Sequence, residues 1–229
     1  MIKIVADENI PFLRGVFEDL ADISFLPAGS IINKEIKNAD CLIIRTRTKC
    51  DRELLEGTSV KFIATTTIGY EHIDTEYCRD NGIKWTNAPG CNANSVNQYV
   101  AAALSLYSKE KEYHLRGKKI GIIGVGHVGK LVMETSRQLG MVPLLNDPPR
   151  ERAEGKGAFV DLDLLLSESD IITLHVPLTM KGEDKTFHLA DEEFLSKARP
   201  STLFINTARG PVMDTGAITE AIDKGIVKG

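Results

Sequence analysis

Three glycines and one aspartate have the types and spacing of a dinucleotide-binding turn. Gly124, Gly126 and Gly129 form a G-x-G-x-x-G pattern, and Asp147 follows further along the chain. In such a pattern the first glycine allows a tight turn, the second lets the backbone approach a pyrophosphate, and the third lets a helix pack closely on a strand. Unpaired amides at the positive end of that helix would then hold the phosphate charge. The spacing therefore predicts a dinucleotide site.

The aspartate bears on which dinucleotide is bound. Asp147 is expected at the carboxyl end of a second strand, where a carboxylate accepts hydrogen bonds from the hydroxyls of the adenosine ribose. Its charge would repel a 2′-phosphate, so NAD is favoured over NADP as the cofactor. Arg150 lies close by in the sequence and leaves that preference open. Within the glycine pattern, His127 is expected to face the phosphates through its backbone.

These residues need a strand, a helix and a second strand to position them. Residues 119–123 form an apolar strand pattern that leads into the glycines, and the apolar run 142–145 ends just before Asp147. Between the two, apolar residues recur at helical spacing from Val128 to Leu139, and Gly140 ends the pattern. Strand, helix and acid thus stand where the dinucleotide fingerprint requires them, which makes it more specific than glycines alone.

Two other nucleotide sites also contain glycine-rich turns. Residues 124–130 fit the G-x-x-x-x-G-K spacing of a P-loop, but Leu131 stands where that motif needs Ser or Thr to bind Mg²⁺. The sequence therefore argues against hydrolysis of a nucleoside triphosphate. A methyltransferase that binds an adenosyl cofactor stays open as an alternative, because it also uses a glycine turn and an acid for the ribose.

Composition and charge bound the partners and the compartment. The chain has 229 residues, which suits two modest domains or one large one. Its net charge of −4 gives no case for nucleic acid or an anionic membrane as a partner. The N-terminus enters a strand pattern without a signal peptide, and no apolar run is long enough to span a bilayer. The four cysteines lack disulfide or metal-ligand spacing, so a cytoplasmic protein with reduced thiols and no metal site is predicted.

Short apolar strands alternate with helical stretches along the chain, which predicts an α/β fold with parallel sheets and helices on both sides. The expected strands are 2–6, 23–26, 41–44, 62–65, 84–86, 119–123, 142–145, 171–174 and 203–205, with a further strand beginning near 226. The expected helices are 11–20, 94–112, 128–139, 162–167, 191–197 and 215–224. The residues 87–90 indicate a turn or a hinge. Two domains are predicted, 1–93 and 94–229.

Further polar residues follow predicted strands, at the edge where open α/β sheets bind ligands. Arg209 could clamp a small carboxylate through two parallel hydrogen bonds, or it could pair with Asp214 at the surface. The threonines of 65–67 could wrap an anion or form a plain polar turn. The three cations of 45–49 could meet a phosphate or lie in a solvated loop. None of the five histidines has a persuasive carboxylate partner, and none is nominated as a catalytic base.

Together these segments resemble the D-isomer-specific 2-hydroxyacid dehydrogenases over the whole chain. The segments that carry the resemblance are VADENIP (5–11), RTRTK (45–49), KFIATTT (61–67), APGCNA (88–93), the glycine segment 121–129, DPPR (147–150) and NTARG (206–210). The resemblance implies two doubly wound parallel-sheet domains, a flavodoxin-like substrate domain and a Rossmann NAD-binding domain. It implies oxidation of 4-phospho-D-erythronate, a small phosphorylated hydroxy acid, to its 2-oxo acid in pyridoxal phosphate biosynthesis. Another D-2-hydroxy acid is the alternative substrate.

The resemblance also implies roles for single residues. Thr46 and Thr67 are implied as substrate contacts, and Arg209 as the catalytic arginine that holds the substrate carboxylate. The implied cofactor-side residues are Gly124, Gly126, His127, Val128, Gly129, Asp147, Val176, Thr207, Ala208 and Arg209. Two positions depart from the usual pattern: Gln98 replaces a glutamate, and Val176 stands where threonine is common.

The family's remaining catalytic residues are expected beyond this sequence. A later strand with an Asp, a Glu that orients a His, and the His that takes the alcohol proton have no counterparts up to Gly229. We therefore expect a truncated member with impaired turnover, and the homodimer of the full-length family is uncertain for it. A non-catalytic NAD-binding module and an inert remnant are the alternatives.

Overall fold

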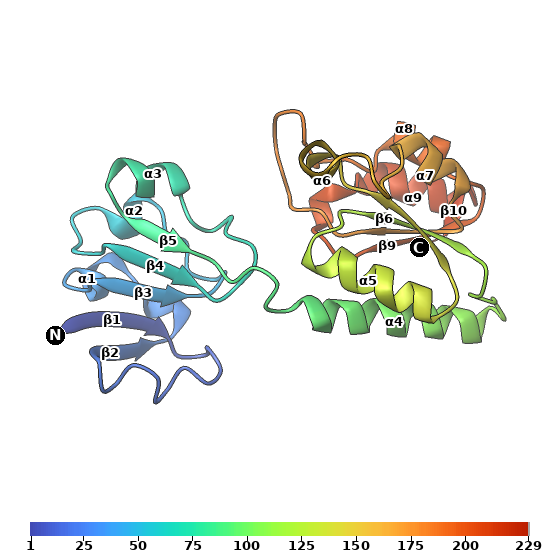
Figure 1. The fold of residues 1–229 in the computed structure, drawn as a ribbon. Coiled ribbons are helices and arrows are strands. Elements are labelled where there is room, and N and C mark those ends of the chain that lie inside the picture. Colours follow the sequence, from blue (N-terminus) through green and yellow to red (C-terminus); the bar gives the residue numbers. More distant parts are fainter. Residues whose placement is uncertain (229) are drawn as a thin grey trace. The chain divides into compact units, whose positions relative to one another are not determined.

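The computed structural model describes residues 1–228, and residue 229, the last of the predicted dinucleotide domain, lies outside the described residues. The chain divides into two compact units, Met1–Cys91 (unit 1) and Asn92–Gly229 (unit 2), and each is described by itself (Figure 1). Within residues 1–228, no helix has both the length and the apolar character needed to cross a bilayer.

Unit 1 is built on a five-stranded parallel sheet. Its strands are β1 (Ile2–Asp7), β2 (Ala21–Leu26), β3 (Cys41–Ile44), β4 (Phe62–Thr65) and β5 (Lys84–Thr86), in the order β2-β1-β3-β4-β5. Every pair is parallel. This order is that of flavodoxin-like folds, whose ligands bind where the strand order reverses, here between the carboxyl ends of β1 and β3. The predicted α/β class is confirmed for this unit.

Both faces of the unit 1 sheet are covered. Short helices α1 (Asn33–Ile36), α2 (Arg52–Leu55) and α3 (Thr75–Asp80), with the 3-10 turn Ala28–Ser30, are the helical elements. One core cluster joins apolar residues of α1, α2 and α3 to β3 and β4, with Ile36, Leu42, Ile44 and Ile63 fully buried. Strands covered on both faces carry continuous apolar runs, which is why 41–44 and 62–65 could be recognised in the sequence.

The predicted helix 11–20 is wrong, because this segment is a series of turns. Gly15 and Phe12 both have positive φ values, 84° and 61°, which a right-handed helix does not allow. The apolar residues also do not form one buried face: Leu13 is buried beside β1, whereas Phe12 is 96% exposed. Leu13 and Phe17 of the segment, with Ile10 just before it, nevertheless cover the second face of the sheet.

Unit 2 contains a second five-stranded parallel sheet. Its strands are β6 (Lys119–Ile123), β7 (Val142–Asn146), β8 (Ile171–Leu174), β9 (Thr202–Asn206) and β10 (Val227–Lys228), in the order β10-β9-β8-β6-β7. Beyond β7, a single parallel bridge joins Leu145 to Phe159, where a Rossmann sheet has one more strand. The arrangement confirms the predicted doubly wound sheet and places its reversal between β6 and β8.

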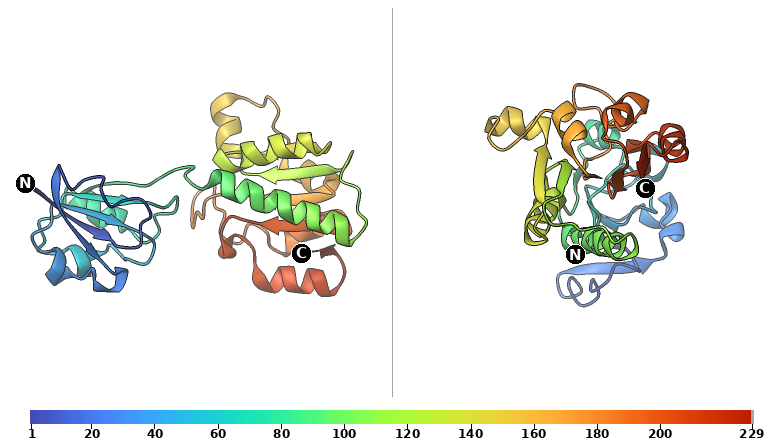
Figure 2. Two further views of the ribbon diagram at one scale, coloured as in Figure 1. Left: turned by 90° about the horizontal axis from the view of Figure 1, so that it is seen from below. Right: turned by 90° about the vertical axis from the view of Figure 1, so that its right-hand side faces the viewer.

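Helices cover both faces of this sheet (Figure 2). They are α4 (Ala93–Glu110), α5 (His127–Gln138), α6 (Pro148–Glu154), α7 (Leu162–Glu168), α8 (Glu192–Lys197) and α9 (Thr215–Asp223), with a 3-10 turn at Gly210–Val212. One core cluster joins α4 and α5 to the sheet, and the other joins α7, α8 and α9 to it. The side chains of successive strand residues, such as Ile122 and Ile123, enter opposite clusters, as the pleat requires.

Candidate functional site

The three glycines between β6 and α5 have different surroundings. Gly124 has φ 86°, and a Cβ there would lie 2.8 Å from the backbone carbonyl of His175. A Cβ on Gly129 would collide with the carbonyl oxygen of Gly124, so only glycine lets α5 start this close to the strand. Around Gly126, by contrast, no atom beyond the glycine itself and its immediate chain neighbours lies within 4 Å of the position that a Cβ would take. Two glycines thus serve packing, and the third leaves open space over the backbone.

Helix α5 begins at this open position. Its N-cap is Gly126, which has no side chain to accept hydrogen bonds from the first turn, and no acidic residue lies in that turn. His127 and Val128 are the first helical residues: His127 is exposed, whereas Val128 packs on the core. The first-turn amides and the helix dipole therefore make this end of α5 suitable for an anion.

Asp147 lies directly at the glycine loop. It follows β7, and its Oδ2 accepts a hydrogen bond of 2.7 Å from the backbone amide of Val125. Its Oδ1 accepts a hydrogen bond of 3.2 Å from the amide of Arg150, which makes Asp147 the N-cap of α6. Two backbone donors therefore fix the carboxylate beside the turn.

Arg150, which left the choice between NAD and NADP open in the sequence, contacts Val125 and Glu154 through its guanidinium. Its Nη1 donates to the carbonyl of Val125 at 2.5 Å, and its Nε and Nη2 bind Glu154 at 2.7 and 2.6 Å. The guanidinium also lies 5.3 Å from the ring centre of Phe159. These groups line a separate cavity of about 300 Å³, which Asp147 does not line.

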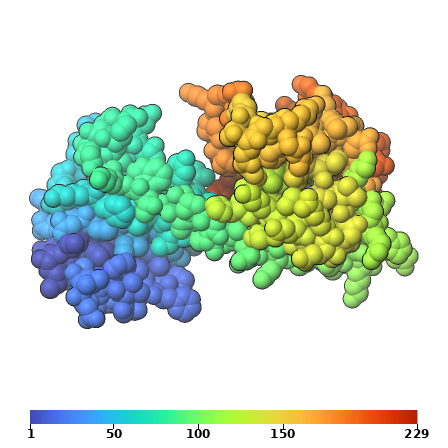
Figure 3. Space-filling view, in the orientation of Figure 1, coloured from blue at the N-terminus to red at the C-terminus, as the bar shows by residue number. Residues whose placement is uncertain are grey.

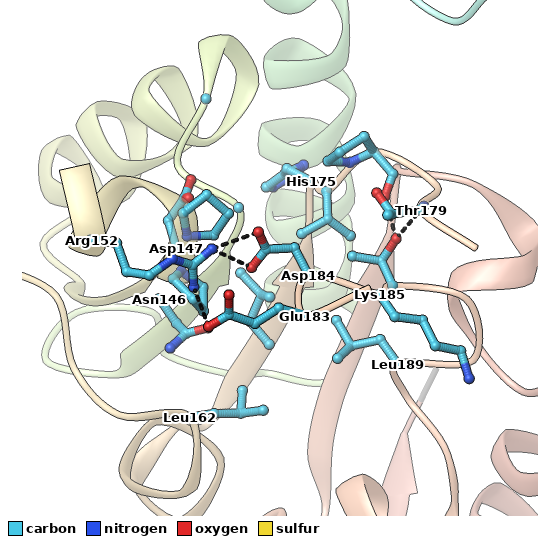
Figure 4. A pocket seen from close by; sticks show the side chains of 18 residues that line it. Asn146, Asp147, Arg152, Leu162, His175, Thr179, Glu183, Asp184, Lys185 and Leu189 are labelled. Carbon is cyan, nitrogen blue, oxygen red and sulfur yellow. Dashed lines mark hydrogen bonds and ion pairs between the residues drawn. The ribbon is translucent and has the colours of Figure 1, made fainter. Parts of the chain in front are cut away.

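A cavity of about 470 Å³ opens beside the glycine loop and Asp147 (Figure 4). Its walls come from the carboxyl ends of β6, β7 and β8, from α6, and from the segment 177–187 that follows β8. The predicted cofactor residues that line it are Gly124, Gly126, Asp147 and Val176. Gly129 does not line the cavity, because it packs against the carbonyl of Gly124. The side chain of His127 does not line the cavity either.

His175 forms part of the cavity wall. Its Nε2 lies 3.0 Å from the Thr173 hydroxyl, and its Nδ1 lies 2.8 Å from the Thr207 hydroxyl. Burial lowers the pKa of His175 to about 4, so the ring is neutral at pH 7. Both ring nitrogens are used, which fits a fixed wall residue rather than a proton acceptor. Through this contact Thr207, another predicted residue, adjoins the cavity.

The turn that carries Arg209 is held by a neighbouring amide. Asn206 Oδ1 accepts from the amide of Ala208 at 2.9 Å, and Asn206 Nδ2 donates to the carbonyl of Arg209 at 2.9 Å. The Arg209 side chain is exposed, and one of its donors reaches the carbonyl of Ala208 at 3.0 Å. Asp214 caps α9 and contacts His188 Nδ1 at 3.2 Å. Neither Ala208 nor Arg209 lines the 470 Å³ cavity.

Sequence reasoning missed four charged residues of the cavity: Arg152 on α6, and Glu183, Asp184 and Lys185 on segment 177–187. Arg152 Nη2 lies 2.7 and 2.5 Å from the two oxygens of Asp184, and its Nη1 lies 3.4 Å from Glu183. The length of the connection between β8 and α8 was the available signal, because connections this long without regular structure are uncommon and often functional.

In unit 1, an arginine and a buried aspartate meet where the strand order reverses. Asp7 ends β1 and is completely buried, and Arg45 follows β3. Arg45 donates from Nε and Nη2 to the two oxygens of Asp7 at 2.9 and 3.2 Å. Burial raises the pKa of Asp7, but hydrogen bonds from Arg45 and Asn9 outweigh that effect and lower it. Nη1 of Arg45 has no partner among residues 1–228.

The two predicted substrate residues follow the carboxyl ends of β3 and β4, which are neighbouring strands of the sheet. Thr46 is exposed directly after Arg45. The Thr67 hydroxyl lies 2.8 Å from that of Thr65 and donates to the carbonyl of Gly69 at 2.9 Å. His72 Nε2 lies 3.0 Å from the Thr65 hydroxyl, and burial lowers its pKa. Three side chains thus form one hydroxyl–imidazole network.

The other cations of 45–49 differ from Arg45. Lys49 pairs with Asp51 at 2.7 Å, while Arg47 is exposed and has no ion pair among the described residues. Of these three cations, only Arg45 has a guanidinium held by a buried carboxylate.

Comparison with known proteins decides to which family the chain belongs. Residues 92–229 match the family described as D-isomer specific 2-hydroxyacid dehydrogenase, NAD binding domain. The chain belongs to this family. The match excludes the methyltransferase alternative and agrees with the Rossmann order of unit 2. It begins at the residue where unit 2 begins.

Relatives within the 2-hydroxyacid dehydrogenases share one name. The chain is 49% identical, over 99% of its length, to erythronate-4-phosphate dehydrogenase of Bacteroides thetaiotaomicron, and it covers 65% of that protein. It is 44% identical, over 98% of its length, to erythronate-4-phosphate dehydrogenase of Porphyromonas gingivalis, and it covers 61% of that protein. The chain thus spans somewhat less than two thirds of these relatives.

Solved structures of family members have the same fold. D-lactate dehydrogenase of Aquifex aeolicus, in complex with NAD and lactic acid, superposes with a TM-score of 0.80 at 31% identity, covering 99% of this chain and 75% of that one. NAD-bound 3-phosphoglycerate dehydrogenase of Entamoeba histolytica superposes with a TM-score of 0.81 at 28% identity, and the match covers 98% of this chain and 77% of that one.

Proposed function

We propose that unit 2 binds NAD through the glycine loop and Asp147. The observation that carries the proposal is the 2.7 Å hydrogen bond between Asp147 and the amide of Val125, beside the open backbone at Gly126. A ribose acid and a phosphate-binding helix end would thereby lie side by side. NAD, when bound, supplies the hydride acceptor for oxidation of an alcohol.

The cavity next to the loop has the character that an adenosine needs. Ile123, Leu162 and Leu189 give it apolar walls, and Asp147 places a carboxylate at its edge. Apolar walls with a few fixed polar groups are typical of nucleotide sites. His175 contributes a neutral ring, so it adds no charge to the wall at pH 7.

The proposal extends to the substrate of the whole protein. The relatives' shared name, together with the sequence resemblance, supports NAD-dependent oxidation of 4-phospho-D-erythronate to the 2-oxo acid, in pyridoxal phosphate biosynthesis and in the cytoplasm. Thr46 and Thr67 would contact that substrate, and Arg209 would hold its carboxylate. Arg45 supports an anion site in unit 1, since its free Nη1 edge can donate to a phosphate.

Two features of organisation belong to the same proposal. The substrate domain would comprise residues 1–93 and the NAD-binding domain residues 94–229. The whole protein would act as a homodimer, as the family resemblance implies.

Titration with NAD tests the cofactor assignment. We expect Asp147→Ala to weaken NAD binding at least about tenfold, because the ribose loses a charged acceptor. The variant also loses the N-cap of α6, which costs about 1 kcal/mol of stability. Asp191→Ala is the matched control: Asp191 caps α8 through the Phe194 amide at 3.0 Å but does not line the cavity.

Isothermal titration calorimetry on the three proteins gives the answer. Weak binding in Asp147→Ala and normal binding in Asp191→Ala support the site. Equal NAD affinity in all three would remove Asp147 from it, and a wild-type chain that binds no NAD would end the proposal.

A further inference from the structure

Arg152 brings a guanidinium into the cavity that Asp147 lines (Figure 4). In dinucleotide sites, an arginine near the ribose acid is the group that accommodates a 2′-phosphate. Arg150 cannot take this part without giving up its contacts with Val125 and Glu154 beside the other cavity. The chain therefore carries, in Arg152, a residue suited to NADP next to an aspartate suited to NAD.

Segment 177–187 is fixed at its neck by one buried threonine. The Thr186 hydroxyl accepts from the amide of Thr179 at 2.7 Å and donates to the carbonyl of Pro177 at 2.5 Å. The amide of Phe187 also donates to the carbonyl of Thr179 at 3.0 Å. These bonds close the segment into a loop. In the space-filling view its orange atoms lie against the gold atoms of α6 (Figure 3).

The tip of this loop holds the arginine. Asp184 places both carboxylate oxygens on Nη2 of Arg152, and Glu183 lies at Nη1. The Arg152 and Asp184 side chains are 44% and 40% exposed, and ion pairs with such exposure contribute little to stability. Their main effect is local, because the donors that would face a phosphate already face carboxylates.

Lys185, the other cation that lines the cavity, does not replace Arg152 as a phosphate donor. Lys185 lies on the same loop, but its amine is 5.8 Å from the ring centre of Phe187 and points away from Arg152 in the close-up (Figure 4). The carboxylates of Glu183 and Asp184 thus pair with the Arg152 guanidinium, and a third carboxylate, that of Asp147, lines the same cavity. The 2′-phosphate of NADP would therefore meet net negative charge at this end of the cavity.

We propose that Glu183 and Asp184 are a second determinant of cofactor selectivity, which excludes NADP by occupying the Arg152 guanidinium that a 2′-phosphate would otherwise engage. This inference rests on the proposed NAD site. It assigns the preference for NAD to two elements, the acid after β7 and the loop after β8, rather than to Asp147 alone.

The test replaces both acids by their amides. In the double variant Glu183→Gln with Asp184→Asn, Arg152 becomes available to a phosphate dianion. We expect the ratio of the NADP and NAD dissociation constants, measured by isothermal titration calorimetry on the 229-residue chain at constant low salt, to fall about tenfold or more. The single variant Asp184→Asn, which removes the closest contacts, should give a smaller shift in the same direction.

Two further variants separate this mechanism from a general change of charge. Adding Arg152→Gln to the double variant should abolish the gain, because the liberated donor is gone. Glu154→Gln is the matched control: it frees Arg150 on the same helix, beside the other cavity, and should leave the ratio unchanged.

The outcomes are distinguishable. If the wild-type chain binds NAD and the double variant keeps the wild-type ratio, the inference is wrong and the NAD site stands. A gain that persists without Arg152, or that appears equally in Glu154→Gln, also overturns it. If the wild-type chain binds no NAD, the proposed function and this inference fail together. Circular dichroism spectra of all variants verify that they are folded.

Discussion

In the glycine loop, 124–129, some glycines are required by the fold, whereas Gly126 is available for binding. Gly124 and Gly129 are surrounded by backbone atoms, so a side chain there would displace the loop itself. Gly126 has negative φ, −76°, and open space where a side chain would start. A methyl group at Gly126 is therefore compatible with the fold, but it occupies the space that a bound pyrophosphate would need.

This contrast makes a prediction for Gly126→Ala. We expect the free energy of unfolding to stay within about 0.5 kcal/mol of the wild-type value, as for surface substitutions. The affinity for NAD should fall about tenfold, since the phosphates can no longer approach the backbone. Thermal denaturation and calorimetric titration measure the two quantities.

Gly29→Ala in unit 1 is the control for this variant, because its Cβ also meets nothing within 4 Å and its φ is not in the left-handed region. It should change neither quantity. Undiminished NAD binding by Gly126→Ala would show that phosphate does not lie over this residue.

Because the pKa of His175 is lowered by burial, we expect the stability of the folded protein to depend on pH. Its pKa is about 4 in the folded protein, because burial disfavours the charged ring, against 6.5 ordinarily. Between these values the unfolded chain binds a proton that the folded chain does not, so stability falls as the pH falls from 6.5 to 4 and is unaffected above 6.5. The loss is at most about 3 kcal/mol. Urea unfolding of the wild type and of His175→Gln at pH 7, 5.5 and 4 measures it.

The comparison between the two proteins isolates the histidine. Carboxylates whose pKa is lowered, such as that of Asp7, also destabilise both proteins in acid, and their contribution cancels. Circular dichroism is the suitable signal, because the single tryptophan, Trp85, lies in unit 1 and does not report on His175. Parallel pH curves for wild type and variant would contradict the prediction.

Among the elements, those with strong periodicity could be predicted from the sequence. The strands 41–44, 62–65, 84–86, 119–123 and 171–174 have the expected bounds, because each is a short apolar run between turn residues. The helix expected at 11–20 failed because spacing alone does not reveal that Phe12 and Gly15 take positive φ. Helix α6 was overlooked, although an aspartate followed by proline is a helix start.

The candidate site also has parts that could be predicted from the sequence and parts that could not. The glycine loop could be predicted because its task depends on backbone geometry, which residue type dictates at each position. Arg152 and Asp184 could not be paired from the sequence, since their contact depends on how the loop after β8 folds over α6. The roles of Thr46, Thr67 and Arg209 stay predictions.

At the scale of the whole molecule, each unit has its own core. The clusters of unit 1 lie on the two faces of its sheet, and those of unit 2 on the two faces of its own. A segment with a complete core of this kind can fold alone. Helix α4 belongs to unit 2, because Val100 and Leu104 on it are buried against α5 and β6.

Expression of the separate units tests this division. The fragment 92–229 should fold and bind NAD with the affinity of the whole chain, because every residue proposed for the cofactor lies within it. The fragment 1–91 should fold and bind none. Circular dichroism, thermal denaturation and calorimetry provide the measurements.

A shorter fragment, 113–229, distinguishes a true boundary from an arbitrary cut. It keeps the glycine loop, Asp147 and the cavity, but it lacks α4 and so exposes the apolar surface that Val100 and Leu104 cover. Removing two buried side chains of this size costs several kcal/mol, about 2–5 for each one lost. We therefore expect this fragment to be unfolded or strongly destabilised. If it folds as stably as 92–229, α4 is a linker, and the dinucleotide unit begins after it.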